Sequence, residues 1–119
     1  EFRDTRDMAI DTAVKLEDAD MIELYSLVDI LKEQKGFIDK ILEIMYLMYR
    51  DALVLKQTGS QKNIIQKDKI PQTEFIARKA TISQLINRCD AINDTRFKLS
   101  HNGNTQLLLE TLFFKIKEK

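Results

Sequence analysis

The sequence contains very few of the residues that interrupt helices. Only three Gly and one Pro occur among its 119 residues. Because Gly and Pro mark many turns, a chain with so few of them favours long helices over many short strands. Sustained alternation of apolar and polar residues, typical of strands, is absent, and no repeat occurs at the periods of solenoid proteins. We therefore predict an all-α fold in which residues 1–119 form one domain, a bundle of five to six helices.

The segment Phe37–Gln57 is the most apolar part of the chain and is expected to form a central helix. One face should carry Ile38, Ile41, Leu42, Met45, Met48, Tyr49 and Ala52, and a second face Phe37, Ile44 and Leu47. A helix that is apolar on two faces normally has neighbours on both sides. The charged pair Arg50–Asp51 interrupts this apolar pattern near the helix end. Three explanations are open: the helix reaches the surface there, the two residues form an internal ion pair, or they contact a partner.

Two helices are predicted before this segment. The first is weak and spans residues 2–16, and its apolar face should consist of Phe2, Ala9, Ala13 and Leu16. The second begins after Asp20, a good N-cap residue, with Glu23 placed for the reciprocal capping contact, and Gly36 ends it. Its expected apolar stripe is Met21, Leu24, Tyr25, Val28 and Leu31.

Three helices are predicted after a long loop, Thr58–Pro71, in which Ile64 and Ile65 should contact the core. The first of these helices is short and ends near Ala80. The next begins at Thr81 with Gln84 placed for a capping box, and its stripe should be Ile82, Leu85, Ile86, Cys89 and Ile92. Asn104 should cap the last helix, whose core face is predicted as Leu108, Leu109, Leu112 and Ile116, with Phe113 on its flank.

The residue inventory gives little material for catalysis or metal binding. With one His and one Cys, the chain cannot form a structural zinc site of Cys and His or the paired Glu-x-x-His pattern of helical di-iron proteins. Cys89 lies on an apolar stripe and is expected in the core, and His101 lies in a turn as a solvated or capping residue, with a contact role as the alternative. No phosphate-binding Gly-rich motif occurs. We expect no cofactor, no metal and no catalytic residues.

The composition also indicates the cellular compartment in which the protein is expected. A single Cys excludes an internal disulfide and fits a reducing environment. No apolar run approaches the roughly 20 residues of a membrane span, and no signal-peptide pattern opens the sequence. The expectation is a cytoplasmic protein. Because the chain starts at Glu1 without Met, it is also expected to be a fragment or a processed product.

Charge is distributed unevenly although the total is zero. Residues 1–23 contain eight acidic and three basic side chains, a balance of −5, whereas residues 56–79 contain six basic and two acidic ones, a balance of +4. Such segments could steer head-to-tail association between like domains, or both could be ordinary solvated surface. A nucleic-acid site in the basic segment is disfavoured because aromatic residues are not interleaved there.

Three segments in order resemble a known family: YRDALVLKQTG at Tyr49–Gly59, NIIQKD at Asn63–Asp68, and NGNTQLLLETLFFKI at Asn102–Ile116. They are similar to the C-terminal domain of bacterial DNA polymerase III delta-prime subunits, which belong to the clamp-loader family. The matching residues are Tyr49, Arg50, Asp51, Leu53, Lys56, Asn63, Asp68, Asn102, Asn104, Gln106, Leu107, Leu109 and Glu110. The tau/gamma collar domain, and an unrelated helical adaptor or ligand-binding bundle with Met45, Met48, Tyr25 and Tyr46 around a pocket, remain as alternatives.

The resemblance implies a collar domain that acts in DNA replication. In clamp loaders, the C-terminal domains of five subunits pack side by side in a ring that holds the ATP-binding modules. The resemblance therefore implies an assembly role without enzymatic activity for this chain, with delta and tau/gamma subunits as partners. It implies no direct contact with nucleic acid or membrane.

Two groups of residues are singled out for specific contacts. Adjacent residues on a helix point about 100° apart, so Arg50 and Asp51 cannot both face one core. We expect at least one of them to hold the following loop, through Asn63 or the backbone near Asp68, with a contact to a neighbouring domain as the alternative. On the last helix, consecutive apolar residues wrap around the axis and leave Leu107, Phe114 or both as an exposed patch. That patch is a candidate subunit interface, with burial under the first helix as the alternative.

Overall fold

The computed structural model describes residues 4–101 and 103–118 of the chain, and those residues form an all-helical bundle without strands. The elements are α1 (Thr5–Leu16), α2 (Met21–Lys32), α3 (Ile38–Thr58), the 3₁₀ turn η1 (Lys67–Lys69), α4 (Ile70–Lys79), α5 (Ile82–Leu99) and α6 (Thr105–Lys117). The predicted fold class is confirmed. Within the described ranges, no helix is both long enough and apolar enough to cross a membrane.

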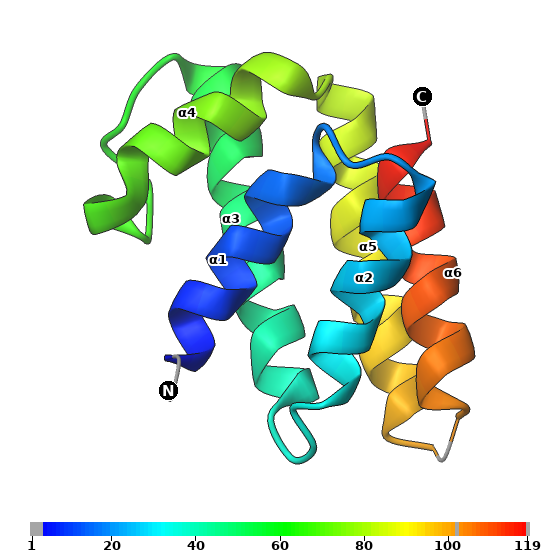
Figure 1. The fold of residues 1–119 in the computed structure, drawn as a ribbon. Helices are drawn as coiled ribbons and strands as arrows, with labels where there is room; N and C mark the ends of the chain where they lie inside the picture. The colour runs from blue at the N-terminus through cyan, green and yellow to red at the C-terminus, as the bar shows by residue number, and fades with distance from the viewer. Residues whose placement is uncertain (1–3, 102, 119) are drawn as a thin grey trace.

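Helix α3 lies at the centre of the molecule, as its two apolar faces predict. It packs against α1, α4 and α5, and α4 lies across the upper end of the bundle in Figure 1. Helix α6 packs against both α5 and α2, and in Figure 1 α2 lies in front of α5 with α6 to the right of both. The fully buried side chains Met45, Met48 and Tyr49 fill the core around α3.

The predicted helix ends are formed by the expected residues. The Asp20 carboxylate accepts the Glu23 N–H at 2.8 Å, and Asn104 accepts the Leu107 N–H at 2.9 Å. Thr81 and Gln84 form both hydrogen bonds of a capping box. These bonds satisfy backbone donors that a helix start leaves without intrahelical partners. One predicted end differs: α2 already ends at Lys32 with Glu33 as C-cap, and Gly36, with a φ of 87°, lies in the turn beyond it. Gly59, with a φ of 68°, is the C-cap of α3.

The first helix differs from the prediction at its beginning. It starts at Thr5, after Asp4 as N-cap, and Phe2 lies outside the described residues. Its core face is larger than expected, since Met8 and Ile10 are buried together with the predicted Ala9, Ala13 and Leu16.

The predicted apolar stripes of α2 and α5 were partly wrong. In α2, Met21 and Tyr25 are exposed, and Leu27 is buried with Leu24, Val28 and Leu31. In α5, Ile82 and Ile86 are exposed and Cys89 is half-buried, whereas Leu85, Arg88, Ile92 and Thr95 are buried. Two overlapping helical stripes exist in each sequence, and neighbour positions rather than spacing decide which one faces the core.

Smaller corrections concern α6 and the loop. Phe113 is fully buried rather than on the flank of α6, and Leu108 is only half-buried. In the loop, Ile64 is buried as expected but the Ile65 side chain is exposed. The loop is also shorter than predicted, because α3 continues to Thr58 and η1 begins at Lys67.

Candidate interaction surfaces and the contacts that hold them

Asp51 is the anchor of the loop between α3 and α4. Its carboxylate is fully buried and accepts the backbone N–H groups of Ile65 at 3.0 Å and Gln66 at 2.9 Å. Arg50 donates to the same carboxylate at 3.1 Å and to the Asn63 carbonyl oxygen at 3.1 Å. A buried carboxylate is tolerated only when charge-assisted hydrogen bonds replace its hydration. Of the two roles considered for the Arg50–Asp51 pair, the observed contacts are those of the intramolecular one.

Two other residues of the family motifs hold the same region. The Lys56 ammonium group donates to the Ala77 carbonyl oxygen at 2.7 Å and so joins the end of α3 to α4. Asp68 accepts both terminal nitrogens of Arg6, at 2.8 and 2.7 Å, which joins the loop to α1. The hydrogen bond from Arg6 lowers the pKa of the Asp68 carboxyl to about 2. The loop is thereby held from α1, α3 and α4.

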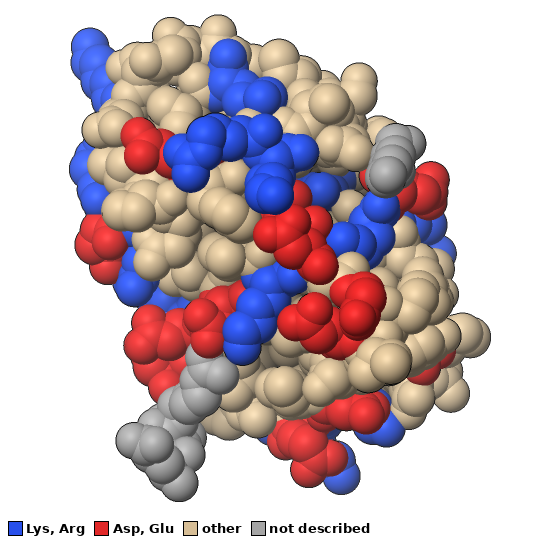
Figure 2. Space-filling view, turned by 45° about the horizontal axis from the view of Figure 1, so that its top comes forward, with Lys and Arg blue, Asp and Glu red and all other residues tan. Residues whose placement is uncertain are grey.

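The acidic and basic segments of the sequence are brought together within the chain. Arg6 pairs with Asp68, Lys79 with Asp18 at 3.0 Å, and Lys69 approaches Asp7 at 3.8 Å. Figure 2 shows the result as a band of mixed red and blue groups across the middle of one face, with blue groups gathered above it. Part of the opposite charge therefore pairs inside one molecule, between side chains that remain partly or largely exposed to solvent.

A buried ion pair joins α1 to α5, and the sequence patterns did not predict it. Arg88 donates to the Glu17 carboxylate through both terminal nitrogens, and the two side chains are 6% and 3% exposed. The guanidinium lies 5.1 Å from the centre of the Tyr49 ring, and burial raises the pKa of the Tyr49 hydroxyl. In the sequence, the only sign that Arg88 faces the core is its spacing. It lies three residues after Leu85 and four before Ile92, on the same face of α5.

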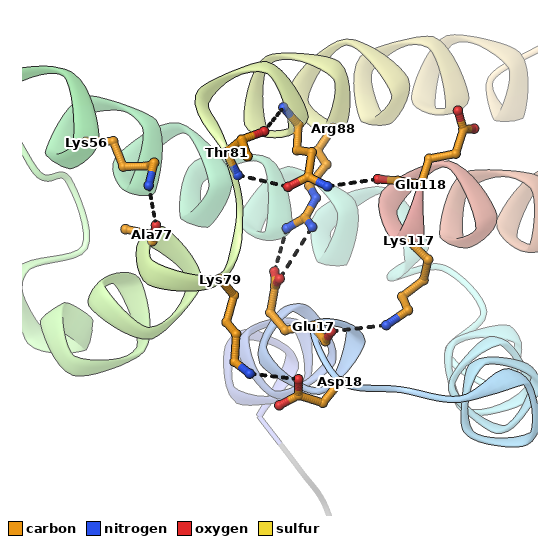
Figure 3. A network of polar contacts seen from close by, with 10 residues as sticks. Glu17, Asp18, Lys56, Ala77, Lys79, Thr81, Arg88, Lys117 and Glu118 are labelled. Carbon is orange, nitrogen blue, oxygen red and sulfur yellow. Dashed lines mark hydrogen bonds and ion pairs between the residues drawn. The ribbon is translucent and has the colours of Figure 1, made fainter.

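Further contacts gather around this ion pair at the turn between α1 and α2 (Figure 3). Lys117 of α6 donates to the Glu17 carbonyl oxygen at 3.1 Å, and Lys79 at the end of α4 pairs with Asp18. Gln84 of α5 donates to the Glu118 carbonyl oxygen at 3.1 Å. Cations from α4, α5 and α6 therefore fix one short turn.

Helices α2 and α6 form an antiparallel pair with an apolar outer surface. Tyr25 and Phe114 meet edge to face with ring centres 5.9 Å apart. Near the other end of the pair, Lys32 donates to the Gln106 side-chain oxygen, and Gln106 donates to Glu110 at 2.9 Å. Leu107 is 60% exposed and Phe114 37% exposed. We call the exposed side chains Tyr25, Leu107 and Phe114 the α2–α6 surface.

The remaining predicted residues do not gather at a chemical site. Asn102 lies outside the described residues. The Asn63 backbone accepts Arg50, and His101 is exposed with its ring 4.3 Å from that of Phe97. Burial, with a contribution from Asp90, raises the pKa of the half-buried Cys89 thiol to about 11, which makes it a poor nucleophile at neutral pH.

The ligand-binding alternative is contradicted by the placement of its four residues. Met45 and Met48 are fully buried in the core, whereas Tyr25 lies on the α2–α6 surface and is 42% exposed. Tyr46 is half-buried and packs against the core. Tyr25 therefore lies apart from the two buried methionines. Among the described residues, no three His, Cys, Asp or Glu side chains are placed to hold a metal ion.

Comparison with known families identifies the domain type. Residues 4–118 match the family model described as DNA polymerase III, delta subunit, C terminal. No curated protein and no solved structure matches the chain significantly. The family model covers nearly the whole chain and agrees with the clamp-loader resemblance carried by the three motifs. The chain therefore belongs to the family of C-terminal domains of DNA polymerase III delta subunits, which are clamp-loader components.

Proposed function

We propose that this domain is the collar domain of a delta-prime subunit, which helps to assemble the clamp loader and performs no catalysis itself. The proposal for delta-prime is supported by the ordered motifs at Tyr49–Gly59, Asn63–Asp68 and Asn102–Ile116. The proposal for an assembly role is carried by one observation, the apolar surface on α2 and α6. Its partners would be the collar domains of delta and tau/gamma subunits.

The α2–α6 surface has the character of a protein interface. Helix α2 buries Leu24, Leu27, Val28 and Leu31, yet also exposes Met21, Ile22, Tyr25 and Ile30. A helix with apolar residues on both faces normally lies between two packed neighbours, and here α6 supplies one of them. Aromatic side chains such as Tyr25 and Phe114 are enriched at interface cores. We infer that a neighbouring collar domain covers the outer face.

The motif residues Tyr49, Arg50, Asp51 and Lys56 have a different role in this proposal. Tyr49 fills the core, whereas Arg50, Asp51 and Lys56 hold the loop and the end of α3. None of the four is itself the contact surface in this proposal. Asn104, Gln106 and Glu110 likewise set the start of α6 and its pairing with α2. In this proposal the motif residues maintain the shape of the domain, whereas Leu107 and Phe114 contact the neighbouring collar domain.

Size-exclusion chromatography with light scattering tests the assignment. The chain is mixed in turn with collar fragments of delta, tau/gamma and delta-prime subunits from its own organism. We expect defined complexes with delta and tau/gamma fragments. A complex with the delta-prime fragment in place of delta would identify the chain as delta, and the absence of any complex would contradict the collar role.

A matched pair of variants tests the surface. Leu107→Asp should abolish the complex because it places a charge in an apolar contact, whereas Ile65→Asp makes the same kind of change at an exposed loop residue and should leave the complex intact. Circular dichroism of both free variants should show unchanged helicity. Equal loss of binding in both variants would remove the α2–α6 surface from the proposal.

A further inference from the structure

The basic residues between Lys56 and Lys79 fall into two groups in the structure. Lys69 lies beside Asp7 of α1, and Lys79 lies beside Asp18 of the turn that follows α1. The other four, Lys56, Lys62, Lys67 and Arg78, have no carboxylate within 4.0 Å in the part of the chain that the structure describes. We call these four side chains the α3–α4 basic surface. Glu74 adds one negative charge, so the formal charge of these five side chains is +3.

Backbone contacts hold two of these cations in place. Lys56 donates to the Ala77 carbonyl oxygen at 2.7 Å, and Lys67 donates to the Lys62 carbonyl oxygen at 3.0 Å. Neither contact supplies a counter-charge, because a carbonyl oxygen carries no formal charge. The positive charge is therefore partly fixed on the surface rather than spread over freely moving side chains.

A shallow hollow of about 430 Å³ lies between the end of α3 and α4. Leu55 and Ala77 supply apolar lining, and Lys56 and Arg78 supply cations at the same hollow, with Gly59 and Glu74 completing it. The Glu74 carboxylate accepts a hydrogen bond from Gln61 at 3.1 Å. An apolar lining beside cations without a carboxylate partner is suited to bind an apolar side chain that has negative charges on both sides.

We propose that the α3–α4 basic surface binds an acidic peptide segment of a partner protein, which inserts one apolar side chain into this hollow. Charge complementarity selects the acidic segment, and the hollow selects the apolar residue within it. The surface is distinct from the α2–α6 surface, because α4 packs mainly on α3 and α1.

A nucleic acid fits the same charges less well. Binding of single strands relies on aromatic side chains that stack on bases. Phe75 is the aromatic residue of this segment, and it is half-buried with the Lys79 ammonium group 5.7 Å from its ring centre. A duplex backbone would contact the cations but leave the apolar hollow unused.

Fluorescence anisotropy on the full chain tests the proposal with three probes. They are a labelled peptide of Glu and Asp with one central Leu, the same peptide with Ser in place of Leu, and a labelled DNA duplex. We expect the Leu peptide to bind more tightly than the Ser peptide and the duplex. Equal affinity for both peptides, tighter binding of the duplex, or no binding of either peptide would each overturn the proposal.

Charge-reversal variants locate the site. Arg78→Glu should weaken binding of the Leu peptide about tenfold. Lys35→Glu makes the same charge change at an exposed residue between α2 and α3 and should leave the affinity unchanged. An equal effect of both variants would show unspecific attraction and overturn the proposal. The collar assignment is tested separately by the Leu107→Asp variant, so failure of one proposal does not imply failure of the other.

Discussion

Asp51 shows how one buried charge can determine the path of a loop. It receives two backbone N–H groups and one guanidinium, while no part of its side chain reaches solvent. The backbone donors come from residues that are not in regular helix, so helix geometry does not satisfy them. Removing the carboxylate would leave these donors without partners, which costs more than the loss of an ordinary surface hydrogen bond.

We expect Asp51→Ala to lower the free energy of unfolding by about 3 kcal/mol, because it removes charge-assisted hydrogen bonds and leaves buried donors unsatisfied. Asp51→Asn retains one acceptor oxygen and should cost less. Urea denaturation followed by circular dichroism measures both. If Asp51→Ala were as stable as the unchanged chain but weakened assembly, Asp51 would be a partner contact rather than a loop anchor.

The Asp68 carboxyl offers a test that does not depend on assembly. Arg6 lowers its pKa to about 2 in the folded chain, below the ordinary value of about 3.9. Because the folded pKa is the lower one, the contribution to stability is complete above about pH 4 and disappears as the pH falls towards 2. NMR titration of the carboxyl should show this low midpoint, and Arg6→Gln should restore an ordinary one. An unchanged midpoint in Arg6→Gln would mean that the pair does not form in solution.

At the scale of single elements, the helix ends are determined locally and the buried faces are not. Asp20, Thr81 and Asn104 cap the helices that the sequence predicts for them, since a cap involves residues only two or three positions apart. The faces of α2 and α5 could not be assigned in the same way. Each presents two apolar stripes, and the sequence contains no sign of which one meets α6 or α3.

Gly59 provides a prediction for the end of α3. Its φ of 68° lies in the left-handed region, and a Cβ added there would meet no atom within 4 Å. Gly59→Ala should therefore destabilise the chain by about 1 kcal/mol through backbone strain alone. Thermal unfolding measures the change. Gln57→Ala, at an exposed position in the last turn of α3, is a suitable control, and an equal loss there would point to the helix end rather than to φ.

At the scale of the whole molecule, the buried pair of Arg88 and Glu17 connects parts of the chain that are far apart in sequence. Glu17 ends α1, Arg88 lies in α5, and Lys117 of α6 reaches the Glu17 carbonyl oxygen. Burying two charges is costly, so such a pair contributes more to a unique arrangement than to net stability. It fixes the turn from which α2, and with it the α2–α6 surface, begins.

We expect Glu17→Gln to lower the free energy of unfolding by about 3 kcal/mol, because it leaves the Arg88 charge buried without its counter-charge. The double variant Glu17→Leu, Arg88→Met should recover most of that loss. Chemical denaturation of Glu17→Gln, of the single variants Glu17→Leu and Arg88→Met, and of the double variant measures these free energies. Additive losses in the double variant would show that the two residues are not coupled.

The sequence by itself determined the all-helical class, the central position of α3 and the capped helix ends. These features follow from composition, periodicity and short-range hydrogen bonding, all of which act over a few residues. Its three motifs also sufficed to suggest the clamp-loader family, which the family match over residues 4–118 supports. The need for a partner at Asp51 could be foreseen, because a charge in so apolar a helix requires one.

Only the tertiary structure decided which apolar stripes are buried, how the α1 and α4 charges pair, and where Arg88 lies. Arg is almost never fully buried without a partner, and Glu17 lies 71 positions away along the chain. The same holds for the α2–α6 surface, since Tyr25 on α2 and Phe114 on α6 meet only after both helices have packed. The physical reason is shared: each of these features depends on how separate helices are placed in space, and local spacing contains no information about that placement.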